Sequence, residues 1–421
     1  MKRNTNTLQA ITDFITDGKH GDCQNQDDSG FYFISSKDIN NGNINYHDAR
    51  QITENDFLET NKRTRFEPDD ILLTNSGTIG RMAIAKNINE TKRTTFQKSV
   101  AIIKPNKKRA LPLWLYYYLK ANINILIDIA SGAAQKNLLL KDIREFKVNL
   151  PEYELQKKIA LILSAYDDLI DNNRQRIKLL EDAVRLLFRE WFVYFRFPGH
   201  EKVKIVYRNG RKIPSEWDYL PFTKIKLFKK APLGVPVFTD TRHYYQTSEI
   251  DGTSITRKGE EVDYENRPSR ANIAPRINTV YFAKMKDTEK VLYFNKVNSD
   301  LLEKILLSTG MVGFTTDEKY LGFLFGLLTS YEFVQYKNNF ATGATQVSLN
   351  DASLKKIKVL FPALNLVELF SEIVNPLLEE CSLLRSQNQK LAQARDLLLP
   401  RLMSGAIDLV RYDKLSNGVE V

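Results

Sequence analysis

Residues 151–198, PEYELQKKIALILSAYDDLIDNNRQRIKLLEDAVRLLFREWFVYFRFP, decide the fold. Apolar residues recur in it at steps of three and four, from Leu155 and Ile159 to Val184 and Trp191, with charged residues between them. This is the period of an amphipathic helix with one apolar stripe. No glycine or proline interrupts residues 152–197, and at 1.5 Å per residue some forty residues make a rod of roughly 60 Å. Such a rod requires a partner helix for its stripe.

The partner helix is written in the same chain. Pro362, Arg385 and Leu398 follow Pro151, Arg174 and Leu187 at one offset, since 362 − 151 = 211. Without a gap, the same offset also matches identical residues at Ala130, Gly132, Ala133, Gln135, Leu138, Lys147, Val148, Leu155, Ile162, Leu180, Ala183 and Leu186. A fixed period of this kind indicates an internal repeat. The chain is predicted to be a tandem duplication, a variable region followed by a helix, twice.

Pro376 lies inside the second helical stretch. Proline removes a backbone hydrogen bond and clashes with the preceding turn. It is therefore predicted to kink the second helix or to break it into two segments.

The composition is that of an ordinary globular protein, with 43% hydrophobic and 27% charged residues among 421. The net charge of +10 suits a polyanionic partner. Cys23 and Cys381 are the only cysteines, which excludes a disulfide framework. The absence of a signal-peptide pattern and of an apolar run of about eighteen residues predicts a cytoplasmic protein without a membrane span.

Both variable regions mix strand and helix patterns. In the first, strands are predicted at 31–35, 71–74 and 100–104, and an aromatic helix at 111–121. In the second, strands are predicted at 244–250 and 279–285, and one aromatic helix at 320–336. The fold class is therefore α/β (α+β), in the order globular region 1–150, helix 151–200, globular region 201–361, and helix with tail 362–421.

No catalytic motif is evident. The sequence lacks the Asn-Pro-Pro-Tyr-like or Pro-Cys site of a DNA methyltransferase, and Ser76–Gly80 fails the phosphate-loop pattern and reads as a tight turn. Asp69, Glu90 and Lys92 loosely match a Mg²⁺-dependent nuclease pattern and remain an alternative. The four histidines are too scattered to form a metal site. Catalytic, cofactor-binding and metal-binding residues are all predicted to be absent.

Basic and amide side chains in Gly- or Thr-rich loops are the better-supported feature. Arg and Lys neutralise phosphates or read guanine, and Gln reads adenine, although a plain surface role is an alternative for any single residue. The predicted DNA-binding residues are Lys19, His20, Arg63, Arg65, Ser76, Thr78, Arg81, Lys92, Arg93, Gln97, Lys98, Gln135, Lys136, Arg242, His243, Arg267, Arg270, Lys284, Lys286, Lys290 and Gln346.

Several stretches resemble one family, the specificity subunits of type I restriction-modification enzymes. They are LPEYELQKKIA at 150–160 running into 173–181, ARDLLLPRLMSG at 394–405, SGTIG at 76–80, FQKSVAIIKP at 96–105 and IPSEW at 213–217. The resemblance implies two target recognition domains separated by an antiparallel pair of long helices. Each domain would read one half of a split, asymmetric DNA sequence, and the helices would set the spacer.

The resemblance further implies a subunit without catalytic residues or cofactors. It would hold two modification subunits, which methylate adenine with S-adenosylmethionine, and would join ATP- and Mg²⁺-dependent restriction subunits. A coiled-coil scaffold that does not bind DNA is a further alternative, which explains the helices but not the paired basic regions.

Overall fold

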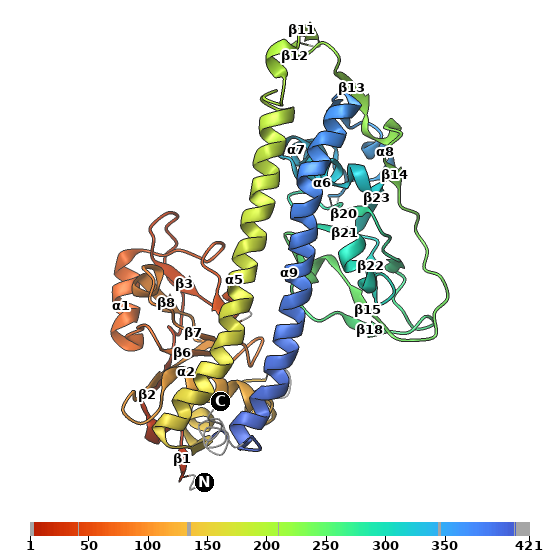
Figure 1. Ribbon diagram of the computed structural model, residues 1–421. Coiled ribbons are helices and arrows are strands. Elements are labelled where there is room, and N and C mark those ends of the chain that lie inside the picture. Colours follow the sequence, from red (N-terminus) through yellow and green to blue (C-terminus); the bar gives the residue numbers. More distant parts are fainter. Residues whose placement is uncertain are drawn as a thin grey trace, which may run out of the picture. The chain divides into compact units, whose positions relative to one another are not determined.

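The computed structural model describes residues 4–40, 42–132, 136–208, 210–343, 347–407 and 409. Two long helices dominate it, α5 (Tyr153–Phe192) and α9 (Leu364–Ser404) (Figure 1). Their first residues differ by 364 − 153 = 211, the offset of the sequence repeat. Both helices were predicted from the repeat, and both predictions are confirmed.

The chain forms two compact units, and each long helix contributes a section to both. The first unit comprises residues up to 169 and from 391 onward, and the second comprises residues 170–390. In the second unit, Ile170 of α5 contacts Asn388 of α9. Arg176 and Ile177, which come later in α5, contact Glu380 and Cys381, which come earlier in α9. The helical sections are therefore antiparallel. The boundary between the units lies inside both long helices, so the predicted domain limits stay a prediction.

The apolar stripes of the helices meet inside each unit. In the second unit Ile177, Val184, Phe188 and Trp191 of α5 share one core with the stripe of α9, namely Val367, Phe370, Val374, Leu378 and Cys381. In the first unit Ile159 and Leu163 join Leu399 and Leu402. Burying each such side chain contributes roughly 1.5–3 kcal/mol.

Pro376 does not break the second helix into two segments, so that part of the prediction is wrong, while a kink stays a prediction. The helix α9 runs through Pro376 from Leu364 to Ser404. Pro376 and Glu372, one turn before it, are exposed, so the carbonyl that loses its partner faces water. Val374 and Leu378 on the opposite face are fully buried and hold the helix in place.

The globular part of the first unit is an α/β arrangement. Its main sheet is antiparallel, in the order β2 (Thr12–Asp17), β9 (Val100–Pro105), β6 (Ile71–Thr74), β7 (Met82–Ile84). Beside it are the parallel pair β3 (Tyr32–Ile34) and β8 (Thr94–Phe96) and the hairpin β4 (Ile39–Asn40) and β5 (Asn43–Ile44). The remaining elements are α1 (Glu54–Thr64), α2 (Pro112–Ala121), α3 (Ile123–Asp128), α4 (Leu140–Glu145) and the pair β1 (Asn4–Thr7) and β10 (Lys147–Leu150).

The second unit repeats this arrangement. Its main sheet has the order β14 (Lys229–Lys230), β23 (Met311–Thr315), β20 (Thr279–Ala283), β21 (Val291–Phe294). A second sheet contains β18 (Glu260–Val262), β15 (Arg242–Tyr245), β22 (Ile305–Ser308) and β19 (Ala271–Ile273), with β15 and β22 parallel. The other elements are the hairpins β11 (Ile205–Arg208) with β12 (Arg211–Pro214) and β16 (Ile250–Asp251) with β17 (Ser254–Ile255), α6 (Leu321–Thr329), α7 (Tyr331–Phe340), α8 (Asp351–Leu354), and β13 (Asp218–Pro221) paired with β24 (Lys358–Phe361).

The duplication extends through the globular parts at the same offset. The hairpin β16–β17 begins 250 − 39 = 211 residues after β4–β5, and β24 begins 358 − 147 = 211 residues after β10. The two copies differ between this hairpin and the next strand of the main sheet. The first unit has α1 there, and the second has β18 and β19. Divergence is therefore concentrated in one segment of a shared scaffold.

Two local predictions in the second unit are wrong. The helix expected at 320–336 is split into α6 and α7 at Ser330, whose hydroxyl caps α7 by accepting from Phe333 N at 3.2 Å. The strand expected to reach residue 250 ends at Tyr245, because Gln246 and Glu249 form a capping box around a short 3-10 turn. In both cases side-chain caps compete with the regular element.

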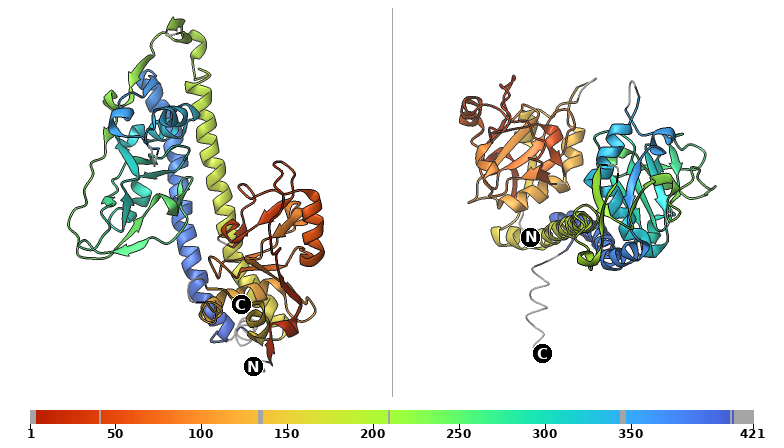
Figure 2. Two further views of the ribbon diagram at one scale, coloured as in Figure 1. Left: turned by 180° about the vertical axis from the view of Figure 1, so that it is seen from behind. Right: turned by 90° about the horizontal axis from the view of Figure 1, so that it is seen from above.

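In each unit one helix lies between the main sheet and the long helices (Figure 2). In the first unit this is α2, whose Tyr117 donates to Asp167 of α5 at 2.7 Å. In the second it is α6, where a Cβ on Gly326 would lie 2.7 Å from a ring carbon of Phe188. Glycine therefore permits the close approach of α6 to the long helices.

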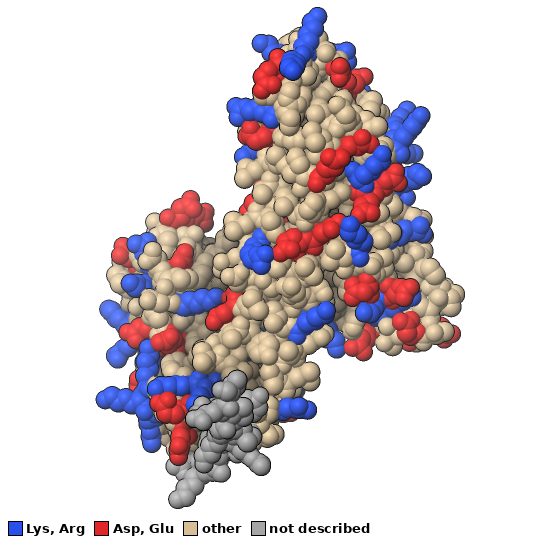
Figure 3. All heavy atoms as spheres, in the orientation of Figure 1, with Lys and Arg blue, Asp and Glu red and all other residues tan. Residues whose placement is uncertain are grey.

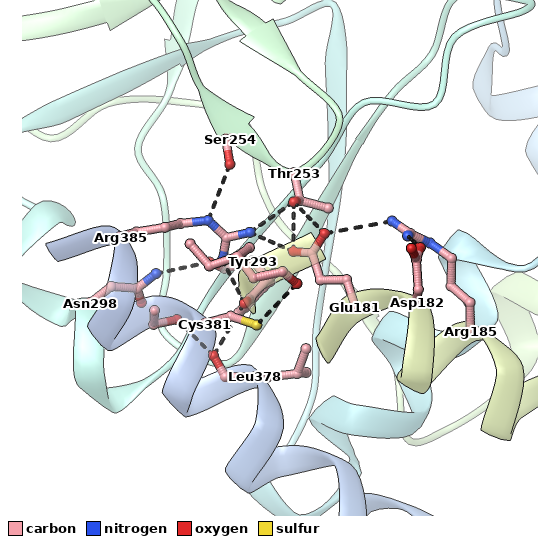
Figure 4. A network of polar contacts seen from close by, with 12 residues as sticks. Glu181, Asp182, Arg185, Thr253, Ser254, Tyr293, Asn298, Leu378, Cys381 and Arg385 are labelled. Atoms are coloured by element: carbon pink, nitrogen blue, oxygen red, sulfur yellow. Dashed lines mark hydrogen bonds and ion pairs between the residues drawn. The ribbon is translucent and has the colours of Figure 1, made fainter. Parts of the chain in front are cut away.

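A buried polar network fixes the β16–β17 hairpin of the second unit to both long helices (Figure 4). The Arg385 guanidinium on α9 donates to Glu181 of α5, to the Tyr293 hydroxyl at 2.7 Å and to Thr253 Oγ1 at 2.8 Å. Thr253, in the hairpin turn, also donates to Glu181 at 2.6 Å. Burial raises the pKa of Tyr293, which keeps its hydroxyl protonated.

The first unit cannot build the same network at the matching positions. The offset places Gly42 opposite Thr253. The strand registers place Ile84 opposite Tyr293, because Ile71 pairs with Ile103 and Ile84 as Val280 pairs with Phe314 and Tyr293. Neither residue has a side chain that could replace the hydroxyl groups of this network. The counterpart of Arg385 is Arg174, which forms a half-exposed pair with Asp171 at 2.9 Å.

The repeat thus supplies a matched pair of mutations. Arg385→Ala removes the guanidinium that hydrogen-bonds to the Glu181 carboxylate, which is 7% exposed, and leaves only Arg185 at 3.7 Å. It is expected to lower the free energy of unfolding by about 3–5 kcal/mol. Arg174→Ala removes an exposed pair and is expected to cost less than about 1 kcal/mol. Urea unfolding of the full chain measures both. Equal losses would contradict a buried clamp at Arg385.

Candidate nucleic-acid interface

Predicted residues of the first unit gather where the loops after β2 and β8 meet. The Lys19 amide donates to Phe96 O at 2.8 Å, and the Lys98 amide donates to Lys19 O at 3.1 Å. Gly18 permits this approach, because a Cβ there would lie 2.0 Å from Phe96 O. The structure thus brings Lys19, Gln97 and Lys98 together.

The loop between β6 and β7 adjoins the same edge. Arg81 donates from Nη1 to Ser36 O at 3.1 Å, and the Ser36 amide donates to Ser99 Oγ at 3.3 Å. The loop is closed by Thr74, whose hydroxyl accepts from Arg81 N at 2.9 Å and donates to Thr78 O at 2.5 Å. It is a tight turn, as predicted, with Ser76 and Thr78 at its tip and Lys136 beside the Ser76–Asn137 bridge.

Other predicted residues of this unit are placed differently. Arg63 and His20 both contact Asp17, the latter at 3.0 Å. Arg65 is the left-handed residue that ends α1. Lys92 and Arg93 precede β8, at the end of that strand opposite to Gln97, and Arg93 lies over the Phe31 ring at 5.7 Å. The structure does not bring these two to the loop edge.

In the second unit, predicted lysines and arginines share the corresponding edge. Lys284 donates its amide to Gly310 O at 2.9 Å, Thr309 donates its amide to Arg270 O at 2.9 Å, and Lys290 Nζ donates to Thr247 O at 2.7 Å. Lys286 donates its amide to Val347 O at 3.0 Å. Among the described residues, no carboxylate lies within 4.0 Å of the charged groups of Arg267, Arg270, Lys284, Lys286 or Lys290.

The charge of this edge is uneven. Burial lowers the pKa of Lys284, and the neighbouring cations Lys230 and Arg270 lower it further, while Asp351 opposes them. Lys230 pairs with Asp351 at 2.5 Å. Lys284 and Arg270 are therefore cations held close to one another, an arrangement that an anion would stabilise.

Two predicted residues of the second unit are more enclosed. Arg242, with 13% of its side chain exposed, lies over Phe238 at 4.2 Å and is 3.9 Å from Asp240. His243 has a buried Nδ1 atom without a hydrogen-bond partner. Both residues begin β15, at the end of that strand opposite to Thr247. Gln135 and Gln346 lie outside the described residues.

Sequence reasoning missed three residues that belong to this edge. Ser36 and Thr247 occupy equivalent positions, since 247 − 36 = 211, and Lys337 of α7 anchors the loop after β20. The offset alone could have found the first two. The local sequence does not indicate a role for Lys337, because a lysine in an amphipathic helix is ordinarily predicted to be a surface residue.

The nuclease alternative is not favoured by the geometry. Asp69 pairs with Lys107 at 2.5 Å, Glu90 begins a 3-10 turn, and Lys92 is exposed. Among the described residues, no three His, Cys, Asp or Glu side chains are grouped so that they could hold a metal ion. In the same part of the chain, no helix is long and apolar enough to cross a membrane.

Charges of both signs are interspersed on the face shown in Figure 3. Lysine and arginine side chains alternate there with aspartate and glutamate over each unit. The net charge of +10 is therefore not gathered into one basic field on that face.

Lys337 of α7 forms hydrogen bonds with the loop that follows β20. Its buried ammonium donates to Met285 O at 3.0 Å and to Thr288 O. Burial lowers the pKa of Lys337 from 10.5 to about 8. The charged form is therefore less favourable in the folded chain than in the unfolded one.

This shift predicts a pH window. Between about pH 8 and 10.5 the unfolded state binds more protons, so the stability penalty from Lys337, present below pH 8, is lost as pH rises. Relative to Lys337→Met, the wild-type free energy of unfolding should rise by about 1–3 kcal/mol across this window. The control variant Lys212→Met, at an exposed position, keeps Lys337 and should follow the wild-type profile. Parallel pH profiles for the three proteins would refute the shift.

Comparison with known proteins identifies the relatives of this fold. Residues 21–182 match the family described as type I restriction modification DNA specificity domain. The MjaIX specificity subunit of a type I restriction enzyme of Methanocaldococcus jannaschii is 26% identical over 89% of this chain and 86% of its own. The EcoBI specificity subunit of Escherichia coli is 32% identical over 36% of this chain and 33% of its own.

A solved structure supports the fold. The S subunit of a type I restriction-modification system from M. genitalium aligns with a TM-score of 0.52 and 15% identity, over 95% of this chain and 96% of its own. The resemblance predicted from the sequence is thus confirmed. At the level of fold, the prediction of two α/β globular parts and a long helix pair is confirmed as well.

Proposed function

We propose that this chain, which is similar to the specificity subunits of type I restriction enzymes, reads a bipartite and asymmetric DNA target. Each globular part would recognise one half of the target. One observation carries the proposal: a single scaffold occurs twice at an offset of 211 residues, and the copies diverge mainly between the small hairpin and the main sheet, at 45–70 and 256–278. Two copies of one DNA-binding domain can each contact one half-site, and the divergence in sequence between the copies allows the two half-sites to differ.

The long helices would set the spacer between the half-sites. A pair of helices whose apolar stripes are buried has a fixed length per residue, so it converts directly into a fixed separation. The loop edges supply the contacts, with lysine and arginine for phosphates and guanine. The alternative of a scaffold that does not bind DNA leaves the unneutralised cations Arg270 and Lys284 without a role.

The chain would contribute no catalytic residue. In the nuclease alternative of Asp69, Glu90 and Lys92, Asp69 is paired with Lys107. S-adenosylmethionine, ATP and Mg²⁺ would be held by partner subunits, two for modification and others for restriction. This chain would then act by placing its partners on a chosen DNA sequence.

Modified-base sequencing tests the proposal directly. DNA from cells that express this chain with its cognate modification subunit should contain a gapped, asymmetric motif with N6-methyladenine in both halves. Replacing residues 1–150 by those of another specificity subunit should change one half only. An ungapped motif, or unmodified DNA although the subunits co-purify, would count against the proposal.

Docking of two modification subunits is supported by exposed leucines that the repeat places twice. Leu186 of α5 is 51% exposed and Leu397 of α9 is 70% exposed, with 397 − 186 = 211. Leu186 is joined on its helix face by Leu179, seven residues earlier. Single exposed leucines are common, but identical ones at equivalent positions suit two copies of one partner. Uncharged surface predominates over the long helices in Figure 3.

Replacing these leucines by a charged residue should therefore prevent the docking of one modification subunit at each replaced position. Leu186→Asp or Leu397→Asp is expected to reduce the complex from two modification subunits to one, and the double change should abolish assembly. Native mass spectrometry measures the stoichiometry, with Leu186→Met as the apolar control. Because both leucines are exposed, stability should change by less than about 1 kcal/mol. Intact assembly of the double variant would place docking elsewhere.

A further inference from the structure

The two units differ in how the cations of the loop edge are neutralised. In the first unit, Lys19 is neutralised by Asp56 at 3.0 Å and by Glu59 at 3.5 Å. At the offset of 211 the Lys98 amide, which donates to Lys19 O at 3.1 Å, corresponds to the Thr309 amide, which donates to Arg270 O at 2.9 Å. Arg270 thus takes the place of Lys19 at this contact, and among the described residues no carboxylate lies within 4.0 Å of its guanidinium. The second unit therefore offers cations where the first unit offers internally paired charges.

Arg267 is held rigidly by a stack of aromatic and cationic groups. Its guanidinium lies 4.1 Å from the centre of the Tyr264 ring, and its Nη1 donates to Tyr264 O. Tyr264 meets Phe238 edge to face at 5.6 Å, and Arg242 covers Phe238 at 4.2 Å. The stack rests on a small apolar core formed by Val235, Tyr244, Val262, Ala271 and Leu306.

The loop that carries Arg267 is itself fixed. Asn266 donates from its amide to Asp263 Oδ1 at 2.7 Å and from Nδ2 to Oδ2 at 2.8 Å. Three residues beyond Arg267, Arg270 accepts from Thr309 N at the loop edge. Arg267 is thus anchored to the part of the second unit where Lys284 and Lys230 gather.

These features fit base reading better than simple charge neutralisation. A free arginine loses much side-chain entropy on binding, whereas a stacked one has lost most of it already. The guanidinium is planar and presents parallel N–H groups that match guanine O6 and N7. With one nitrogen bound to Tyr264 O, the Arg267 guanidinium retains further N–H donors for a base.

We propose that Arg267 reads a guanine in the half-site of the second unit, while Arg270 and Lys284 hold an adjoining backbone phosphate. The inference rests on the proposed function. Arg242 and Phe238 act as positioning residues, since they support Tyr264 from beneath. The first unit, in which Asp56 and Glu59 neutralise Lys19, uses different chemistry at its loop edge. The arrangement belongs to the segment in which the two copies diverge.

Arginine substitutions test base reading in the assembled complex. With Arg267→Lys, which keeps the charge but loses the planar fork, and with Arg267→Gln, one guanine of the motif should become degenerate in one half only. The other half and the spacer should stay unchanged. Exposed Arg257→Gln is the matched control for lost charge and should leave the motif intact.

Base analogues supply a readout that does not depend on modification activity. Duplexes carrying 7-deazaguanine at each guanine of the second half-site should show one position at which wild-type binding weakens roughly ten- to hundred-fold. At that position the Arg267→Gln complex should lose almost nothing further. Arg270→Gln should instead weaken binding to all sequences alike and reduce the slope of log affinity against log salt by about 0.9.

The outcomes separate the two proposals. If the wild-type complex modifies no bipartite motif, the proposed function itself is wrong. A bipartite motif that survives both Arg267 variants, a second half-site without guanine, or equal 7-deazaguanine losses in wild type and Arg267→Gln overturns the role of Arg267 alone. A uniform loss of affinity in Arg267→Lys, with no change of sequence preference, would reduce Arg267 to a structural residue.

Discussion

The burial of two apolar stripes is the constraint on which the rest of this structure depends. A helix of 40 residues cannot leave Val184, Phe188 and Trp191 in water, and the matching stripe lies in the second copy of the same repeat. Pairing the copies antiparallel buries both stripes within each unit. Once the helices are fixed, each globular part is positioned through one intervening helix, α2 or α6.

The copies have kept their packing and changed their polar contacts. The main sheet recurs in the same strand order, and the parallel strand pair and the small hairpin recur at one offset, because their core positions are filled by apolar residues that tolerate exchange. The polar clamps are not repeated. Arg385 joins Glu181, Thr253 and Tyr293 in the second unit, whereas Asp167 joins Tyr117 and Arg395 in the first. Each unit has therefore evolved its own polar attachment to the same helices.

The loop edges show the same separation between scaffold and chemistry. The backbone contacts that bring the loop after β8 to its neighbours are matched by contacts at Gly310 and Thr309 in the second unit. The charges at this shared backbone contact differ, because Lys19 is neutralised by Asp56 and Glu59. Among the described residues, no carboxylate pairs with Arg270 at the equivalent contact. A duplicated scaffold can thus present two unlike surfaces without a change in fold.

The sequence by itself determined the helices, their pairing by duplication and the mixed α/β class. Periodicity and a constant offset are local or one-dimensional signals, and a stripe such as Leu155 to Trp191 has few other ways to be buried. The effect of Pro376 could not be predicted, because it depends on which face of α9 is buried. Nor could the site be chosen from a list of basic residues. Lys19 and Arg270 look alike in the sequence, and only the tertiary structure shows that carboxylates neutralise the first and not the second. Charge at a surface is set by neighbours that lie far apart along the chain, and only folding decides which neighbours those are.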